Sequence, residues 1–202
     1  MTSSSTGAPA RPAAGRPRNS DTTALILQAA LDLGEKAGFG SLTMEGIAAH
    51  AGVAKTTIYR RWPSVWGIVM DAFLAEITKV APLQKRPTAR ASFKASMRLL
   101  AKSYRGRQGK ILHLLLGQAQ LDEKLRREVA TRWVVPRREV ALEFVRHGIE
   151  TGELRRGLDP DIVLDALYGP LYHRLLVPYD DAPISDAYVD SLVDTVFRGL
   201  ER

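Results

Sequence analysis

One short stretch of the sequence combines cationic and hydroxyl side chains and contains no acid. Residues 55–61 have the sequence Lys-Thr-Thr-Ile-Tyr-Arg-Arg, and if Ile58 packs inward the other side chains share an exposed helical face. Threonine is short enough to reach base edges or a thymine methyl group, and arginine pairs with phosphate or with guanine. This face therefore indicates contact with double-stranded DNA. The candidate contacts are Lys55, Thr56, Thr57, Tyr59, Arg60 and Arg61.

The residues before this helix can form a second helix that packs against it and holds it in place. Ala48 is small enough for two helices to cross, and Gly52, four residues later, tolerates the positive φ of a tight turn. Short helices are expected over 44–50 and 55–61, and four apolar residues would lock them together: Ile47, Val53, Ile58 and Trp62. This spacing predicts a helix-turn-helix over 43–62. A solvated helical hairpin with a few surface cations is the alternative.

Residues 24–72 resemble the N-terminal domain of the tetracycline-repressor (TetR) family. The shared elements are Ile26-x-x-Ala29-Ala30-x-x-Leu33 leading to Gly38-Phe39, then Leu42-Thr43-x-x-x-Ile47-Ala48-x-x-Ala51-Gly52-Val53, and Thr57-Ile58-Tyr59-Arg60-Arg61-Trp62-Pro63-Ser64. The resemblance implies a three-helix DNA-binding domain, followed by a variable helical domain that dimerises and holds a ligand pocket. It also implies that Thr43 caps the first motif helix and touches phosphate. Lys55, Thr56 and Thr57 would meet bases, Tyr59 phosphate, and Arg60 either.

Two flanking features bear on phosphate contact. Val65 stands where many relatives of this family carry a lysine, although Ser64 can cap the helix that starts there. Residues 1–20 are rich in Ser, Ala, Pro and Gly and predict a disordered basic arm. Arg16 and Arg18 in this arm are candidate minor-groove contacts. A solvated tail that adds only non-specific attraction is the alternative.

Helical periodicity without strand-like alternation predicts an all-α fold of about nine helices. A helix-turn-helix domain over 21–66 would be followed by a ligand-binding and dimerisation domain over 67–202. Beyond the motif, helices are expected from Ser64 to about Val80, with a bend at Pro136 in a later one. The remaining expected helices cover 88–105, 109–118, 122–148, 160–177 and 185–200.

The net charge of +7 is unevenly distributed along the chain. Acids and bases balance over 21–62, whereas 81–110 has nine basic residues and no acid, and the last forty residues are acidic. The case for DNA therefore depends on the geometry of the motif more than on bulk charge. For the basic run from Lys85 to Lys110 we expect a solvated face, with attraction of an anionic ligand as the alternative.

The larger domain offers candidate residues for a pocket and for an interface. Polar or aromatic residues on otherwise apolar helical stretches could line a ligand cavity, with ordinary core or surface positions as the alternative. They are Met97, His113, Gln118, Trp133, Phe144 and His147. The resemblance implies a four-helix dimer interface from the last two helices, with burial inside the monomer as the alternative. Its candidates are Leu167, Leu171, Leu175, Tyr188, Leu192 and Val196.

The sequence lacks the residues that several kinds of catalysis and metal binding require. There is no cysteine, the four histidines are dispersed, and neither a GxSxG elbow nor a phosphate-binding glycine loop occurs. We therefore expect no enzyme, metal or cofactor. No apolar run is long enough for a signal peptide or a membrane span, so a cytoplasmic, nucleoid-associated location without a membrane partner is expected.

Taken with the motif, these observations predict a sequence-specific DNA-binding transcriptional regulator. The expected form is a homodimeric repressor that an unknown small-molecule effector releases from a palindromic operator. The alternatives are a non-specific chromosome-binding protein, or a helical ligand-binding protein without operator function.

Overall fold

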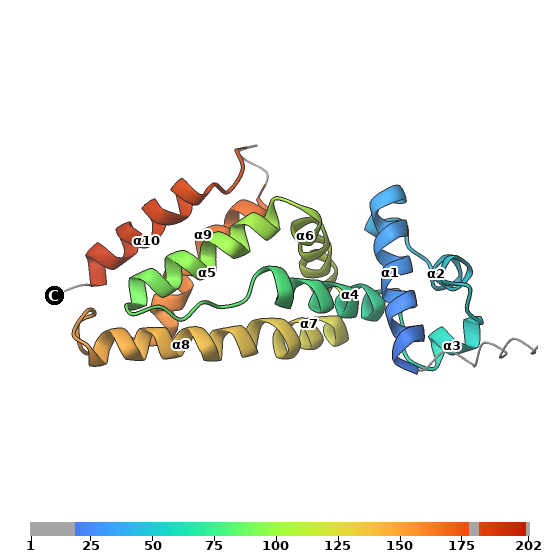
Figure 1. Ribbon diagram of the computed structural model, residues 1–202, viewed down its shortest axis with the longest axis horizontal. Coiled ribbons are helices and arrows are strands. Elements are labelled where there is room, and N and C mark those ends of the chain that lie inside the picture. The colour runs from blue at the N-terminus through green and yellow to red at the C-terminus, as the bar shows by residue number, and fades with distance from the viewer. Residues whose placement is uncertain (1–18, 178–181, 201–202) are drawn as a thin grey trace, which may run out of the picture.

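The computed structural model describes residues 19–177 and 182–200, which contain helices and no strand, so the all-α prediction is confirmed. Figure 1 shows α1 to α3 at one end of an elongated molecule and the C-terminus of α10 at the other. A 3₁₀ turn (Phe39–Ser41) follows α1, and a π-helical turn (Ala130–Val134) joins α7 to α8. The helices are α1 (Asn19–Ala37), α2 (Met44–Ala51), α3 (Lys55–Tyr59), α4 (Val65–Val80), α5 (Ala89–Tyr104), α6 (Arg107–Ala119), α7 (Glu123–Val129), α8 (Val135–Glu150), α9 (Pro160–Leu176) and α10 (Asp186–Leu200).

The first three helices enclose a small apolar core of their own. α1 ends at Ala37 because Gly38 adopts φ 89°, a conformation that favours glycine. The core residues come from α1, α2, α3 and the start of α4: Ile26, Ala29, Ala30, Met44, Ile47, Ala48, Ile58, Trp62 and Ile68. The helices of this domain cover one another's apolar faces.

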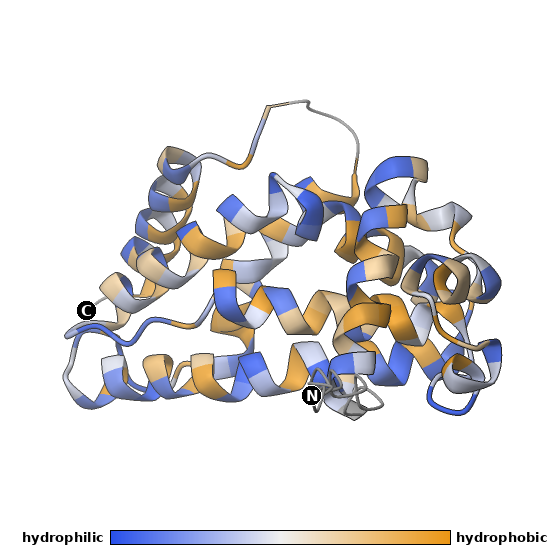
Figure 2. Cartoon of the chain, turned by 45° about the vertical axis from the view of Figure 1, so that its right-hand side comes forward, coloured by the Kyte–Doolittle hydropathy of each residue, from blue (hydrophilic) through white to orange (hydrophobic). Residues whose placement is uncertain are grey.

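Helix α4 belongs to two cores at once. Ile68 packs in the small core, whereas Val69, Phe73 and Ile77 on other sides of the helix pack in the core of the larger domain. The boundary expected between residues 66 and 67 therefore falls in the first turn of a shared helix. In Figure 2 the apolar residues of the larger domain lie mainly where its helices face one another, and hydrophilic residues lie on the outer sides.

The helix expected over 122–148 contains a π turn instead of a simple bend at its proline. Pro136 has no backbone N–H, and its ring would crowd the carbonyl one turn earlier. The chain widens into the π turn directly before it, and the backbone N–H of Val135 bonds to the carbonyl of Ala130. π turns occur frequently at functional sites.

The basic run of α5 is only partly the solvated face that the sequence predicts, because some of its exposed cations pair with acids of α10. It lies against the acidic side of α10, as the two neighbouring helices in Figure 1 show. Lys94 Nζ lies 2.6 Å from Asp194 Oδ1, Arg98 Nε donates to Asp190 Oδ1 at 2.7 Å, and Arg105 pairs with Asp186. Much of the charge imbalance along the sequence is thus neutralised within the chain.

A close approach at the start of α6 makes a prediction about stability. A Cβ atom on Gly109 would stand 1.9 Å from the carbonyl oxygen of Tyr104, whereas one on Gly117 in the same helix would meet nothing within 4 Å. We expect Gly109→Ala to destabilise the fold by about 1–3 kcal/mol through overpacking. Gly117→Ala, the matched control, should stabilise it by about 0.5–1 kcal/mol. Urea unfolding measures both, and equal effects would contradict this account.

Candidate nucleic-acid interface

The turn between α2 and α3 has the geometry that the sequence predicts. Thr43 Oγ1 accepts a hydrogen bond from the backbone N–H of Gly46 at 3.0 Å and caps α2. Gly52 ends α2 in the left-handed region, with φ 66° and ψ 31°. Ala48 is buried, and its carbonyl accepts from the N–H of Val53 at 3.0 Å. The two short helices are therefore held at a fixed mutual orientation.

Helix α3 presents a mixed cationic and hydroxyl surface. Ile58 is fully buried and anchors the helix, Thr57 is half-buried, and four side chains are exposed: Lys55, Thr56, Tyr59 and Arg60. The helix is shorter than predicted, because it ends at Tyr59 and Arg60 serves as its cap. The structure thus places five of the predicted contacts together on or beside one short helix.

α3 itself contains no acid, as the sequence predicts, but an acid of α2 lies beside its surface. Tyr59 donates its hydroxyl hydrogen bond to Glu45 Oε1 on α2 at 2.7 Å. This hydrogen bond raises the pKa of Tyr59 above its ordinary value and lowers the pKa of Glu45 below its own. The sequence shows Glu45 near the start of α2. It does not show that Glu45 contacts Tyr59, because the two residues lie 14 positions apart.

Arg61 and Trp62 turn away from the α3 surface and join it to the rest of the chain. Arg61 Nη1 donates to Thr23 Oγ1 on α1. Trp62 Nε1 donates to Asp71 Oδ2 on α4 at 2.7 Å, and Arg132 of the π turn pairs with the other oxygen of the same carboxylate at 2.6 Å. The end of the motif is thereby fixed to α1, to α4 and to the larger domain.

The start of α4 differs from the expectation in one respect. Ser64 is the N-cap residue, but its side chain accepts no hydrogen bond from the helix, so the expected side-chain cap is wrong. Val65 is half-buried against the small core. Arg16 and Arg18 lie outside the described residues.

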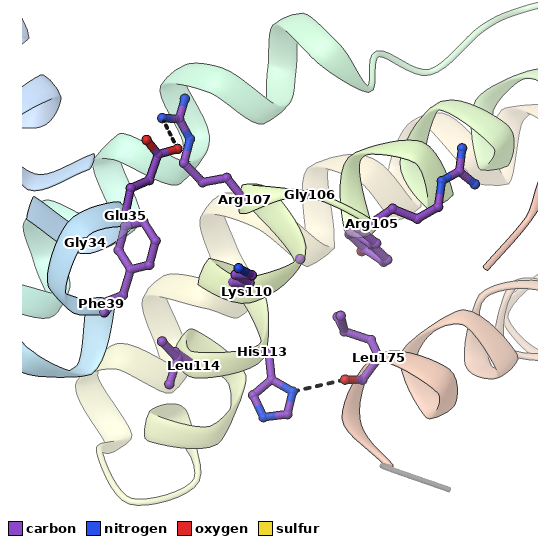
Figure 3. A pocket seen from close by; sticks show the side chains of 13 residues that line it. Gly34, Glu35, Phe39, Arg105, Gly106, Arg107, Lys110, His113, Leu114 and Leu175 are labelled. Atoms are coloured by element: carbon purple, nitrogen blue, oxygen red, sulfur yellow. Dashed lines mark hydrogen bonds and ion pairs between the residues drawn. The ribbon is translucent and has the colours of Figure 1, made fainter. Parts of the chain in front are cut away.

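A cleft separates α1 and its 3₁₀ turn from α6, with a volume of about 820 Å³ (Figure 3). Arg107 at its edge pairs with Glu35 of α1 at 2.8 Å and with Glu76 of α4 at 2.6 Å. His113 lines the cleft, and its Nδ1 lies 3.0 Å from the carbonyl oxygen of Leu175. The cleft therefore lies between α1 of the small domain and α6 of the larger domain.

The other predicted pocket residues are not gathered around one cavity. Met97, Trp133 and Phe144 are buried in the core of the larger domain, where Trp133 stacks edge-on against Phe73 and Phe144 against Phe93. His147 Nε2 lies 3.2 Å from the carbonyl oxygen of Pro87, and Gln118 is half-buried.

The predicted interface residues divide into two groups. Leu167 and Leu171 are fully buried in the core of the single chain, so their side chains are not available to a partner. Leu175, Tyr188, Leu192 and Val196 are only partly buried. Sequence periodicity alone could not separate these groups, because α9 is apolar on most sides.

Among the residues that the structure describes, no helix is long and apolar enough to cross a membrane. The same part of the chain holds no group of three or more His, Asp or Glu side chains arranged for a metal ion.

A capped helix, a left-handed glycine turn and a short exposed cationic helix define a helix-turn-helix DNA-binding protein. The family comparison agrees: residues 26–65 match "Bacterial regulatory proteins, tetR family", and residues 86–196 match "Tetracyclin repressor-like, C-terminal domain". The chain belongs to the TetR family of transcriptional regulators, as the resemblance predicted.

Relatives cover nearly the whole chain. It is 38% identical over 187 residues, 93% of each chain, to the uncharacterized HTH-type transcriptional regulator YdeS of Bacillus subtilis (strain 168). The crystal structure of the TetR family transcription regulator SCO0332 is similar with a TM-score of 0.74 and 33% identity, covering 90% of this chain and all of that one.

The Tyr59–Glu45 hydrogen bond makes a prediction about titration. In Tyr59→Phe the carboxylate of Glu45 loses its hydroxyl donor, so its pKa should rise toward the ordinary value of glutamate. A pH titration followed by NMR of the side-chain carboxyl measures this. Tyr188→Phe in α10 is the control and should leave the pKa of Glu45 unchanged. A pKa of Glu45 that is the same in wild type and Tyr59→Phe would contradict the assignment.

Proposed function

We propose that this regulator is a homodimeric repressor that binds a palindromic operator through α3 and is released by a small-molecule ligand. The observation that carries the proposal is the exposed cationic and hydroxyl face of α3, supported by the buried Ala48 crossing and Ile58. Two solved structures with the same fold are complexes with small-molecule ligands. They are FadR from Bacillus subtilis with stearoyl-CoA (17% identity, TM-score 0.70, covering 88% of this chain and 99% of that one) and RolR with resorcinol (20%, 0.64, covering 90% and 88%).

The roles of the contacts follow from side-chain length and position. Lys55, Thr56 and Thr57 at the start of α3 would meet base edges in the major groove. Thr43, Tyr59 and Arg60 would meet phosphate, and Arg16 and Arg18 an adjacent minor groove. Arg61, which holds α1 through Thr23, would orient the helix and touch DNA only at the margin. Tyr59 must exchange Glu45 for phosphate on binding.

The dimer would form through the outer surfaces of α9 and α10. α9 exposes one face on which residues recur at three- and four-residue spacing, and apart from His173 they are apolar or small: Ile162, Ala166, Gly169 and Leu176. Beside it, Tyr188, Leu192 and Val196 of α10 are partly exposed. Small residues allow two helices to approach closely, and a two-fold dimer would read two half-sites about one helical turn apart.

The proposal is tested by selecting genomic DNA fragments with the purified protein. We expect one enriched inverted repeat, whose log affinity falls linearly with log salt concentration. Fragments without a common sequence would contradict operator recognition and would favour a non-specific chromosome-binding protein. No enrichment at any salt concentration would favour a ligand-binding protein without operator function.

Removing the acid beside α3 should strengthen binding to DNA. Two unit charges about 4 Å apart in water interact by ~1 kcal/mol, so Glu45→Gln should raise operator affinity about fivefold at low salt. Glu150→Gln, at the end of α8 far from α3 in Figure 1, removes the same charge and should have no effect. Fluorescence anisotropy with labelled operator measures both variants. An unchanged or weaker affinity for Glu45→Gln would contradict the placement of α3 against phosphate.

Charging the α10 surface should separate the subunits. Leu192→Asp places a carboxylate in the proposed interface, where it would be buried without a partner. Sedimentation equilibrium should then give the mass of a monomer. Leu121→Asp, at an 85% exposed position outside α9 and α10, should leave the dimer intact. A dimeric mass for Leu192→Asp would exclude this interface.

A further inference from the structure

A second, smaller cavity lies inside the larger domain, between α5, α8 and α9. Its volume is about 50 Å³, well above the ~10–15 Å³ of probe-occupied space that one water molecule needs. Leu100 of α5 and Val134 of the π turn form apolar walls, and Tyr168 and Tyr172 of α9 add aromatic ones. None of the side chains that the sequence analysis selected for a pocket lines this space.

Buried polar groups beside this cavity have no partner in the protein. Arg137 Nη1 donates to the carbonyl oxygen of Ala81 at 2.9 Å, and its guanidinium stacks 4.6 Å from the Trp133 ring, but Nη2 is buried without a hydrogen bond. The hydroxyl of Tyr168, which lines the cavity, is also buried without a partner. Native proteins pair nearly all buried polar groups with protein, water or a bound ligand, so these unpaired donors are free to hold a ligand that enters the cavity.

The unpaired polar groups beside the cavity indicate the charge of the ligand that would bind there. Arginine is always protonated in proteins, and within the described residues Arg137 has no carboxylate partner. Burial raises the pKa of Tyr168 to about 12, so its hydroxyl stays protonated and can donate. The described residues that line the cavity include no acid, and Arg138 at its rim is already paired with Asp161 and Asp165. Every free polar group can therefore donate, and one carries a positive charge.

We infer that this cavity is the effector site and that it takes the carboxylate of a small organic acid, held by Arg137 and the Tyr168 hydroxyl. A carboxylate offers two acceptor oxygens in the plane that a guanidinium favours and neutralises its buried charge. The space is enough for such a head group and a few apolar atoms against Leu100 and Val134. A longer body would have to displace the neighbouring side chains of α8 and α9.

This site is connected directly to the DNA-binding domain. Ala81, whose carbonyl Arg137 holds, is the C-cap residue of α4, and the other end of α4 packs in the small core. A carboxylate that binds Arg137 competes with this carbonyl for the guanidinium and changes the support of α4. Only this effect on α4 rests on the proposed release by ligand. Binding of the carboxylate to the cavity needs no DNA and can be measured separately.

The experiment measures ligand binding to the DNA-free protein by calorimetry. The probes are straight-chain carboxylates from acetate to octanoate and benzoate, each paired with its uncharged primary amide. We expect at least one carboxylate to bind saturably at one site per chain, and its amide to bind at least tenfold more weakly. No binding by any carboxylate, or equal binding by the amide, would overturn the inference.

Two substitutions in the cavity test whether the carboxylate binds there. Arg137→Met keeps the apolar stem on Trp133 but removes the charge, and should weaken carboxylate binding at least tenfold. Arg146→Met, an exposed arginine on the same helix, is the matched control and should bind as wild type does. Tyr168→Phe, which removes one donor and keeps the ring, should weaken binding about threefold and serves if Arg137→Met does not fold. Undiminished binding in both cavity variants would overturn the site. Operator selection fails or succeeds independently of these results.

Discussion

The carboxylate of Asp71 on α4 accepts hydrogen bonds from two parts of the chain that have separate cores. One oxygen holds Trp62 at the end of the helix-turn-helix and the other holds Arg132 in the π turn, at 2.7 and 2.6 Å. Further along α4, Glu76 holds Arg107 of α6, which also reaches Glu35 of α1. Each pair is partly exposed and contributes little alone, but together they fix one helix between two domains. A rotation or shift of α4 therefore changes the position of α3.

The sequence identifies the motif because its requirements are local. Thr43, Ala48, Gly52 and Ile58 lie within 16 residues, and each meets a backbone or packing need that only a few residue types satisfy. The charge distribution was misleading because the charges that pair are far apart along the chain. Arg98 and Asp190 are 92 residues apart, so nothing in a single sequence shows that the basic run of α5 and the acidic side of α10 neutralise each other.

The cavity residues escaped prediction for a related reason. Arg137 has the sequence neighbourhood of a surface residue, but in the structure it is half-buried and lines the cavity beside α9. Tyr168 and Tyr172 fit the apolar pattern of their helix and gave no polar signal. The fully buried positions of Leu167 and Leu171 likewise depend on how α9 packs in the large core, so periodicity alone could not show that their side chains are unavailable to a partner.

In the proposed dimer, α4 would couple the larger domain to the spacing of the two DNA-binding motifs. The chain has no cysteine, so Lys36→Cys at the exposed end of α1 gives one spin label per subunit. Pulsed electron resonance then measures the distance between the two labels, with operator DNA and with a carboxylate that calorimetry has shown to bind. The account predicts one narrow distance on DNA and a shifted distribution with the ligand, because the motifs no longer fit half-sites about 34–36 Å apart. Identical distributions in the two states would contradict it.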